Sequence, residues 1–500
     1  MQMTITKVAA VVAVTFALSL AGPAGAQSPT DLNIGNFLDV TSWDPSLADI
    51  GFDGPYMSAV YDPLVALDAD GKILPALATT WTYSDDLLKL TMDLRTDVKF
   101  SDGEAFNAQA AVENLEHLKA GARSGEAYVN VAAFKAVDED TIEIDLTKRD
   151  DSMLYLMGLG RSYMASPAAI KAGTLTTTPA GSGPYVLDDG MSIPGSEYHF
   201  TKVADHWDSA TYPFQNIAVY PILDATARHN AMLSGQINVN FADPLNIEQA
   251  KQMGWNINSA VSAWVGLQFV DHTGEHLKPL GDVRVRKALN YAFDGAAILN
   301  SIGAGDGVVT NQVFPAGRQG NDPSLNALYA YNMDKAKALL AEAGYADGFD
   351  VTMPMSPIFA QWQPVADQTF KELGIRVTWD DMQMPDYQIN APKYPMFITL
   401  IAMDNDPAAT LARQVETVQW YNPTPQYATV PELKSLVEAA QSAVGDDQIA
   451  KIAAANKALT EMAWWSVWYQ ANNTYFSTPD IAVTPVTGMM FPTLRFIQPN

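Results

Sequence analysis

Short runs in which hydrophobic and polar residues alternate recur along the chain. This period of two is typical of β-strands that bury one face. The pattern predicts a strand at each of eight runs, which are residues 31–37, 141–146, 217–222, 237–241, 264–270, 349–353, 375–379 and 396–401.

Helical patterns lie between many of these runs. Asp282 is a suitable N-cap for a segment with apolar residues on one face, which Gly303 ends. Asn332 precedes a second segment whose apolar residues recur every three or four positions, and Gly344 stops it. Each pair of boundary residues predicts one continuous helix.

Two more helices are predicted toward the C-terminus. Pro431 suits the first turn of one, and the next runs from Asp447 to about Trp464. Trp464, Trp465 and Trp468 are also predicted to lie on a helix, as core residues. The mixture of strands and helices favours an α/β architecture, with mixed sheets covered by helices. No long Pro-, Gly- or Ser-rich linker occurs, so we expect lobes joined by short crossings.

The composition is that of a folded, acidic protein. Hydrophobic residues make up 48% of the 500 residues and charged residues 17%, which excludes disorder as the main state. The 56 Asp and Glu outnumber the 30 Lys and Arg, and the net charge of -26 would repel nucleic acids and anionic membranes. Because the chain has no Cys, disulfides, thiolate metal sites and lipid-modified cysteines are excluded.

Residues 1–26 have the features of a cleaved secretory signal. Lys7 precedes an apolar run over residues 8–20, and small residues follow at Ala24 and Ala26. A membrane anchor is the alternative, but a run of roughly 13 residues is short of the about 20 needed to span a bilayer. We therefore expect a periplasmic protein that is not lipid-anchored.

A search for catalytic and metal-binding motifs yields none. His272 and His276 are four residues apart, but Thr273 and Gly274 between them argue against a rigid helix and so against a zinc site. Nucleophile elbow, Walker loop, dinucleotide fingerprint and HExxH motifs are absent. We therefore predict a protein that is not an enzyme and that has no metal site and no cofactor.

Several blocks of sequence, taken together and in this order, resemble those of the extracellular solute-binding proteins of family 5. These are the dipeptide-, oligopeptide- and nickel-binding components of ABC importers. The blocks are residues 61–65 (YDPLV), 70–78 (DGKILPALA), 98–103 (VKFSDG), 181–185 (GSGPY), 283–292 (VRVRKALNYA) and 336–345 (AKALLAEAGY).

The resemblance implies a two-lobed periplasmic binding protein fold of type II, with an extra N-terminal subdomain. Lobe I would comprise residues 27–260 and 475–500, with the extra subdomain at about 65–180, and lobe II residues 261–474. Two crossings, near residues 259–268 and 469–476, would let the lobes close over a ligand.

The resemblance also implies candidate ligand-binding residues. In peptide-binding relatives, an Asp in the loop after the strand that corresponds to residues 396–401 accepts the ligand's α-ammonium. Asp404 is the first candidate for this role and Asp406 the second, although Asp406 precedes Pro407 and is more readily explained as a helix cap. In nickel-binding relatives, an aromatic residue near Tyr128 and an arginine near Arg161 serve the ligand, while a surface salt bridge is an equal alternative for Arg161.

Aromatic residues in predicted loops and crossings are further candidates for the walls of the cleft. They are Trp264, Trp420 and Tyr421, with Trp43 and Phe52 as weaker candidates for its mouth.

The sequence thus favours a periplasmic receptor that delivers a small polar ligand to an ABC permease in the inner membrane. A peptide, or a similar compound with amine and carboxylate groups, is the expected ligand. A metal-chelate or sugar receptor is the alternative within the family, and a secreted hydrolase is the alternative from another class. We expect a monomer that does not bind nucleic acid.

Overall fold

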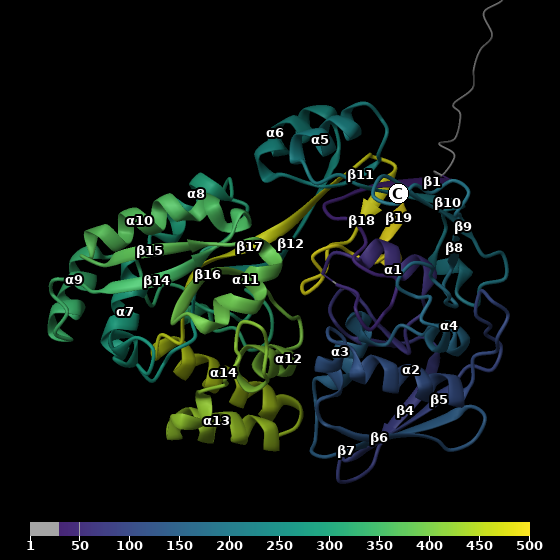
Figure 1. Ribbon diagram of the computed structural model, residues 1–500, viewed down its shortest axis with the longest axis horizontal. Coiled ribbons are helices and arrows are strands. Elements are labelled where there is room, and N and C mark those ends of the chain that lie inside the picture. Colours follow the sequence, from purple (N-terminus) through teal and green to yellow (C-terminus); the bar gives the residue numbers. More distant parts are fainter. Residues whose placement is uncertain (1–29, 50) are drawn as a thin grey trace, which may run out of the picture.

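Two bodies of mixed α/β structure lie side by side in the computed structural model (Figure 1). The structure describes residues 30–49 and 51–500, so the predicted signal sequence lies outside the described residues. We call the body that contains the N-terminal strand lobe I and the other lobe II. The segments at each of the eight predicted runs are strands.

A nine-stranded sheet continues from one lobe into the other. Its order is β16-β12-β17-β11-β1-β10-β9-β8, and β13 also pairs with β17. The strands are β1 (Asp31–Asn36), β8 (Tyr185–Leu187), β9 (Tyr198–Lys202), β10 (Asn216–Pro221), β11 (Val239–Phe241), β12 (Asn256–Phe269), β13 (Gly307–Val308), β16 (Met396–Ala402) and β17 (Trp465–Ser477).

Strands β12 and β17 connect the two lobes. They pair antiparallel from Asn256 opposite Ser477 to Gln268 opposite Trp465, with two irregularities in register. In lobe II, β12 also pairs with β16, whereas in lobe I β17 pairs with β11. The segments predicted as crossings, residues 259–268 and 469–476, lie within these two strands.

Lobe I is built from both terminal parts of the described chain. Helices α1 (Gly54–Val60) and α4 (Pro167–Ala172) and the hairpin of β18 (Ile481–Val483) and β19 (Ile497–Pro499) belong to it. Leu32 and Ile34 of β1 share one hydrophobic core with Ile481 and Ile497. Two further helices, α5 (Ala225–Leu233) and α6 (Ile247–Met253), lie above β11 in Figure 1.

A four-stranded antiparallel sheet lies at the lower end of lobe I, within the region expected to be the extra subdomain. Its order is β4-β5-β7-β6, and α2 packs on it. The elements of this region are β2 (Val65–Leu67), β3 (Ile73–Pro75), β4 (Ala78–Tyr83), β5 (Lys89–Leu94), α2 (Ala108–Ala120), β6 (Val131–Ala136), β7 (Thr141–Leu146) and α3 (Met153–Leu156).

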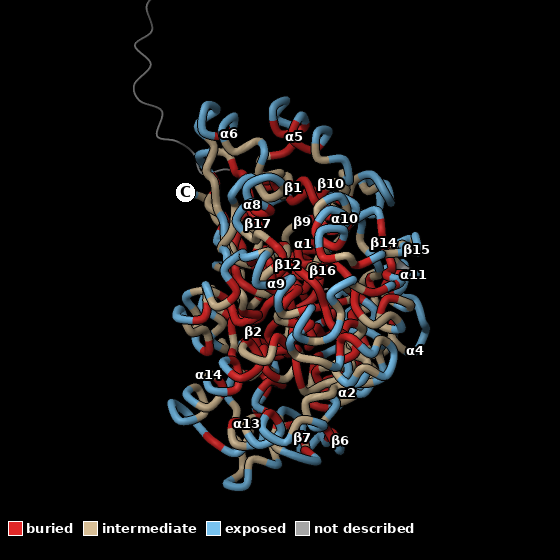
Figure 2. The backbone as a smooth tube through the Cα atoms, turned by 90° about the vertical axis from the view of Figure 1, so that its left-hand side faces the viewer, coloured by how far each residue is buried: buried red, intermediate tan, exposed pale blue. Residues whose placement is uncertain are grey.

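Lobe II contains most of the remaining helices. The parallel pair of β14 and β15 packs beside β16 in its core. The elements are α7 (Val283–Ala292), α8 (Gly295–Ile302), α9 (Met333–Glu342), β14 (Asp350–Met355), α10 (Gln363–Glu372), β15 (Arg376–Asp381), α11 (Met384–Asn390), α12 (Pro407–Leu411), α13 (Pro431–Ser442) and α14 (Gly445–Glu461). Figure 2 shows buried backbone around β12 and β16, with exposed turns on the outer helices.

The single helix predicted between Asp282 and Gly303 is in fact two helices. Helix α7 ends at Ala292, and the Asp294 side chain accepts a hydrogen bond from the Ala297 N–H (3.0 Å) to begin α8. Gly295 packs against β17, since a Cβ there would lie 2.1 Å from the Trp468 carbonyl oxygen. The break therefore lets the chain approach the connecting strand closely.

The helix predicted to reach Trp464 ends earlier. Helix α14 ends at Glu461, and Trp465 and Trp468 lie on β17. All three tryptophans are buried, as predicted, but their placement on a helix was wrong. Most of the lobe II half of β17 is buried on both faces, so hydrophobic and polar residues do not alternate along it. Its apolar sequence was therefore mistaken for an extension of the preceding helix.

Candidate functional site

Four charged side chains meet where the two lobes contact each other; Arg161 and Asp404 are buried, and Glu126 and Arg413 are partly buried. Glu126 and Arg161 come from lobe I, and Asp404 and Arg413 come from lobe II. We call these residues the four-charge cluster. Two acids face two bases, so the cluster as a whole is neutral.

The lobe I half of the cluster is a close ion pair. Arg161 donates from Nε and Nη2 to Glu126 Oε1, at 2.9 and 2.5 Å. Gly160 precedes Arg161 with a φ of 101°, a conformation that favours glycine, and turns the chain at this point. The Tyr128 hydroxyl donates to the Arg161 carbonyl oxygen (2.5 Å), which fixes the backbone beneath the guanidinium.

The lobe II half is a second ion pair of the same kind. Asp404 follows β16 directly, is fully buried, and accepts from Arg413 Nη1 at 2.8 and 3.0 Å with its two oxygens. Arg413 Nε lies 3.6 Å from Glu126 Oε2 across the lobe boundary. The Asn405 N–H donates to the Tyr155 hydroxyl of lobe I (2.9 Å) beside this contact. Each lobe thus keeps its own neutral pair, and the two pairs touch.

The charges of Glu126 and Arg413 are stabilised by their neighbours, whereas burial raises the pKa of Asp404 in spite of Arg413. Burial opposes ionisation of Glu126, but Arg413 and Arg161 outweigh it and lower its pKa to about 2. Burial likewise opposes the charge on Arg413, but Asp404 and Glu126 raise its pKa well above the ordinary value. Both groups are therefore charged at neutral pH.

Two N–H groups of the cluster have no hydrogen-bond partner among the described residues. They are Arg161 Nη1 and Arg413 Nε, and both atoms are buried. Buried N–H groups are almost always paired, so these two mark a place where a ligand or water would bind.

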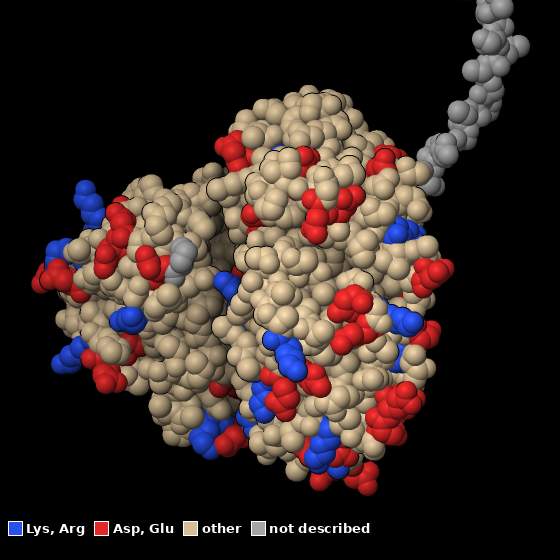
Figure 3. Space-filling view, turned by 45° about the vertical axis from the view of Figure 1, so that its right-hand side comes forward, with Lys and Arg blue, Asp and Glu red and all other residues tan. Residues whose placement is uncertain are grey.

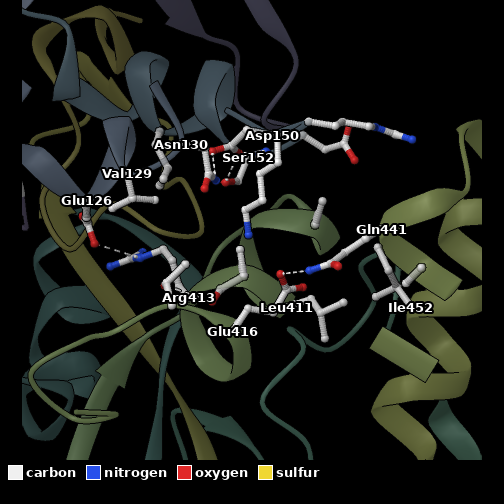
Figure 4. Close-up of a pocket in the computed structure, with 18 of the residues that line it drawn as sticks. Glu126, Val129, Asn130, Asp150, Ser152, Leu411, Arg413, Glu416, Gln441 and Ile452 are labelled. Carbon is white, nitrogen blue, oxygen red and sulfur yellow. Dashed lines mark hydrogen bonds and ion pairs between the residues drawn. The ribbon is translucent and has the colours of Figure 1, made fainter. Parts of the chain in front are cut away.

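A pocket of about 190 Å³ opens beside the cluster, between the lobes (Figure 4). We call it the interlobe pocket. Glu126 and Arg413 line it, together with Asn130, Lys148, Asp150, Ser152, Leu411, Glu416, Gln441 and Ile452 among others. Figure 3 shows the two lobes meeting along a groove, with acidic and basic side chains on the surface around it. The pocket receives polar groups from both lobes, as a site that closes over a polar ligand requires.

The structure brings several of the predicted residues to the four-charge cluster, but none of the predicted residues lines the interlobe pocket. Arg161 and Asp404 belong to the cluster, and Tyr128 supports Arg161. The Tyr421 hydroxyl donates to the Arg413 carbonyl oxygen (3.3 Å), and Trp264 Nε1 donates to Gln414 beside it (3.3 Å). These two aromatic residues are buried and support the segment that carries Arg413.

Three other predicted aromatic residues lie outside the cluster and do not line the interlobe pocket. Trp420 stacks on Phe397, with ring centroids 5.8 Å apart. Trp43 is buried in the core of lobe I against Tyr198, and Phe52 packs against Phe37.

The Asp404 carboxylate is already paired with Arg413 in this structure. A ligand amine would reach its carboxylate only by displacing Arg413. Sequence reasoning missed Arg413 and Glu126. Arg413 pairs with Asp404 across a turn of the chain, and Glu126 pairs with Arg161, which is 35 residues away, and with Arg413 of the other lobe. An acid in an Asp-Pro loop stands out in the sequence, but neither of these residues lies in a motif.

Asp406 caps a helix, as the sequence predicts. Its Oδ1 accepts from the Ala409 N–H (2.7 Å) at the start of α12, and burial raises its pKa to about 6. Because this pKa is above that of an unfolded Asp, about 3.9, stability contributed by this group falls as pH rises from about 4 to 6.

Replacing Asp406 with Ala should lower the free energy of unfolding by about 1 kcal/mol, because the cap is lost. Asp406→Asn is the control, since Asn also caps helices but does not titrate. Urea unfolding between pH 4 and 7 measures both variants. The Asn variant should keep most of the stability and lose the pH-dependent part. Equal losses in the two variants would contradict a capping role.

Comparison with known proteins places these features in context. The model of the bacterial extracellular solute-binding proteins, family 5 Middle, matches residues 72–422. The glutathione-binding protein GsiB of Escherichia coli (strain K12) is 30% identical over 346 residues, which cover 67% of this chain and 65% of that protein. GsiB of Salmonella typhimurium (strain LT2) is 31% identical over 350 residues with the same coverage. The match thus spans less than two thirds of the length of these relatives.

Solved structures match nearly the whole fold. AgaA, a PBP from A. tumefacien R10 in complex with agropinic acid, has a TM-score of 0.81 and 21% identity, covering 94% of this chain and 98% of that one. The periplasmic binding protein DppA from Helicobacter pylori, in complex with the peptide STSA, has a TM-score of 0.80, 20% identity and the same coverage. NikA from Brucella suis with Fe(III)-EDTA has a TM-score of 0.78 and 20% identity, covering 94% of this chain and all of that one. These similarities confirm the predicted two-lobed fold.

Proposed function

Because the chain belongs to the bacterial extracellular solute-binding proteins of family 5, we propose that it is the periplasmic solute receptor of an ABC transporter. It captures a small polar ligand between its lobes and delivers it to a permease in the inner membrane. No helix in the described part of the chain is long and apolar enough to cross a membrane. Lobe I comprises residues 27–260 and 475–500 in this proposal, and lobe II residues 261–474.

The interlobe pocket is the observation that carries this proposal. Both lobes contribute charged and amide groups to it, so a ligand with charges of both signs stabilises the closed arrangement by touching both. A peptide, or a similar compound with amine and carboxylate groups, has this chemistry. The relatives named as glutathione-binding support the choice, since glutathione is such a compound.

A metal-chelate receptor is the second candidate. The unpartnered N–H groups of Arg161 and Arg413 suit the carboxylates of a chelate as well as those of a peptide. The structure of NikA with Fe(III)-EDTA shows that a protein of the same fold takes such a ligand. A secreted hydrolase is disfavoured by family membership, because the family is described as solute-binding.

Ligand binding should stabilise and compact the protein. At a hundredfold excess of ligand over Kd, the free energy of unfolding should rise by about 2.7 kcal/mol. Thermal melts with reduced glutathione, dipeptides and Fe(III)-EDTA identify the ligand class, and small-angle scattering measures the radius of gyration. A ligand that raises Tm without compaction would contradict closure, and mass analysis that shows cleavage of the peptide would favour the hydrolase.

A further inference from the structure

The interlobe pocket has a second charged region away from the four-charge cluster. Glu416 lies there, on the short helix η9 (Ala412–Glu416) that also carries Arg413. Its carboxylate accepts a hydrogen bond from Gln441 Nε2 of α13, and no cation is in ion-pair contact with it among the described residues. Figure 4 shows this pair beside the pocket, apart from Glu126 and Arg413.

The charges that surround Glu416 leave this region negative. Lobe I places Lys148, Asp150 and Asp151 within its electrostatic reach, and the first attracts while the other two repel. Asp151 is paired with Arg149 (2.7 Å), whereas Asp150, among the described residues, is bonded only to neutral groups, Asn130, Ser152 and the Met153 N–H. From lobe II, Gln441 and the phenol of Tyr427 face the same carboxylate. When Glu416 is ionised, the three acids Glu416, Asp150 and Asp151 therefore face two cations, Lys148 and Arg149, and this end of the pocket lacks one positive charge.

We propose that Glu416 accepts the cationic amine of the ligand, whose carboxylate binds at the Arg413 end of the same pocket. This inference rests on the proposed function. A charge-assisted hydrogen bond from an ammonium group supplies the missing positive charge at Glu416. At the other end, Arg413 Nε lies 3.6 Å from Glu126 Oε2 but makes no hydrogen bond among the described residues, so it can donate to the carboxylate. Asp404, by contrast, already has its cation in Arg413.

Proton release on binding follows from this assignment. Burial raises the pKa of Glu416 to about 7, despite the hydrogen bond from Gln441, so the carboxyl group is partly protonated in the free protein near neutral pH. An ammonium group binds the ionised form and lowers this pKa. Uptake of an amine-bearing ligand therefore releases a fraction of a proton near pH 7, and affinity increases as pH rises from about 5 to 7.

The test uses reduced glutathione, several dipeptides and their N-acetyl derivatives, which lack the cationic amine. Titration calorimetry of Glu416→Gln should show at least about 30-fold weaker binding of the amine-bearing probe, and no further loss for the acetylated probe. Repeating the titration of the unaltered protein in two buffers of different ionisation enthalpy should show proton release, which Glu416→Gln abolishes. Glu438→Gln is the control, because Glu438 is an exposed acid of α13 paired with Lys434.

Each other outcome has a distinct meaning. Equal losses for the amine and acetylated probes would overturn the assignment of Glu416, as would an amine-specific loss in Asp404→Asn that exceeds the loss in Glu416→Gln. If the unaltered protein binds the amine-bearing probes and Glu416→Gln binds them equally well, only this inference fails. If the unaltered protein binds no amine-bearing probe, the peptide-like ligand and this inference fail together.

Discussion

Replacing Arg413 with Met should lower the free energy of unfolding by about 3–5 kcal/mol, because the change leaves a buried carboxylate without its cation. Asp404 is fully buried, and both of its oxygens accept from Arg413. Both residues belong to lobe II, so the loss occurs within that lobe whether or not the lobes are closed. Unfolding in urea, followed by fluorescence, measures the change.

A double variant separates the lost ion pair from lost packing. Arg413→Met combined with Asp404→Asn removes the charge of both partners, so it should regain most of the stability lost by the single change. If the double variant is as unstable as Arg413→Met, the stability comes from packing of the arginine stem, and the account of the ion pair is wrong.

The second large effect is expected at Glu126. Glu126→Gln removes the acid that lies between two guanidinium groups, so Arg161 loses its ion partner and faces Arg413 across the lobe boundary. Like charges repel, so the ligand-free lobes should separate, and the radius of gyration from small-angle scattering should increase. Affinity for the ligand should fall by roughly 30-fold or more, because the closed state loses a buried charge partner.

Glu113→Gln is the matched control for this prediction. Glu113 is an exposed acid on α2 of the same lobe, and within residues 30–49 and 51–500 its side chain bonds only to Gln109. Its replacement should leave both shape and affinity unchanged. High salt should reduce the effect of Glu126→Gln only slightly, because buried charges are poorly screened. An unchanged radius and unchanged affinity in Glu126→Gln would show that the cluster does not hold the lobes together.

Local chemistry made much of the fold predictable from the sequence. The strand predicted over residues 141–146 is β7, with the same bounds, because its alternating residues face core and solvent in turn. The cap at Asp406 was predictable for the same reason, since the residues that decide it are neighbours. Trp465 and Trp468 were misplaced because strand β17 is buried on both faces there, so its sequence has no period of two.

The site was less predictable than the fold. Asp404 and Arg161 could be named from a resemblance, but their ion partners could not. Glu126 meets Arg413 only because the lobes are folded against each other. Glu416 and Gln441 likewise meet through the packing of α13 beside the pocket. The spacing of residues in the sequence does not predict these contacts, because they form only when distant segments pack together in the tertiary structure.

The place of β17 in the sheet has a consequence for the order of folding during synthesis. Strand β11 of lobe I pairs with β17, and the core of that lobe includes Ile481 and Ile497. A ribosome makes these segments about 235–255 residues after β11, which corresponds to roughly 12–50 s at 5–20 residues per second. Until then, lobe I lacks part of its core, and β11 lacks its neighbouring strand β17. The nascent chain therefore cannot complete its first lobe before its last segments exist.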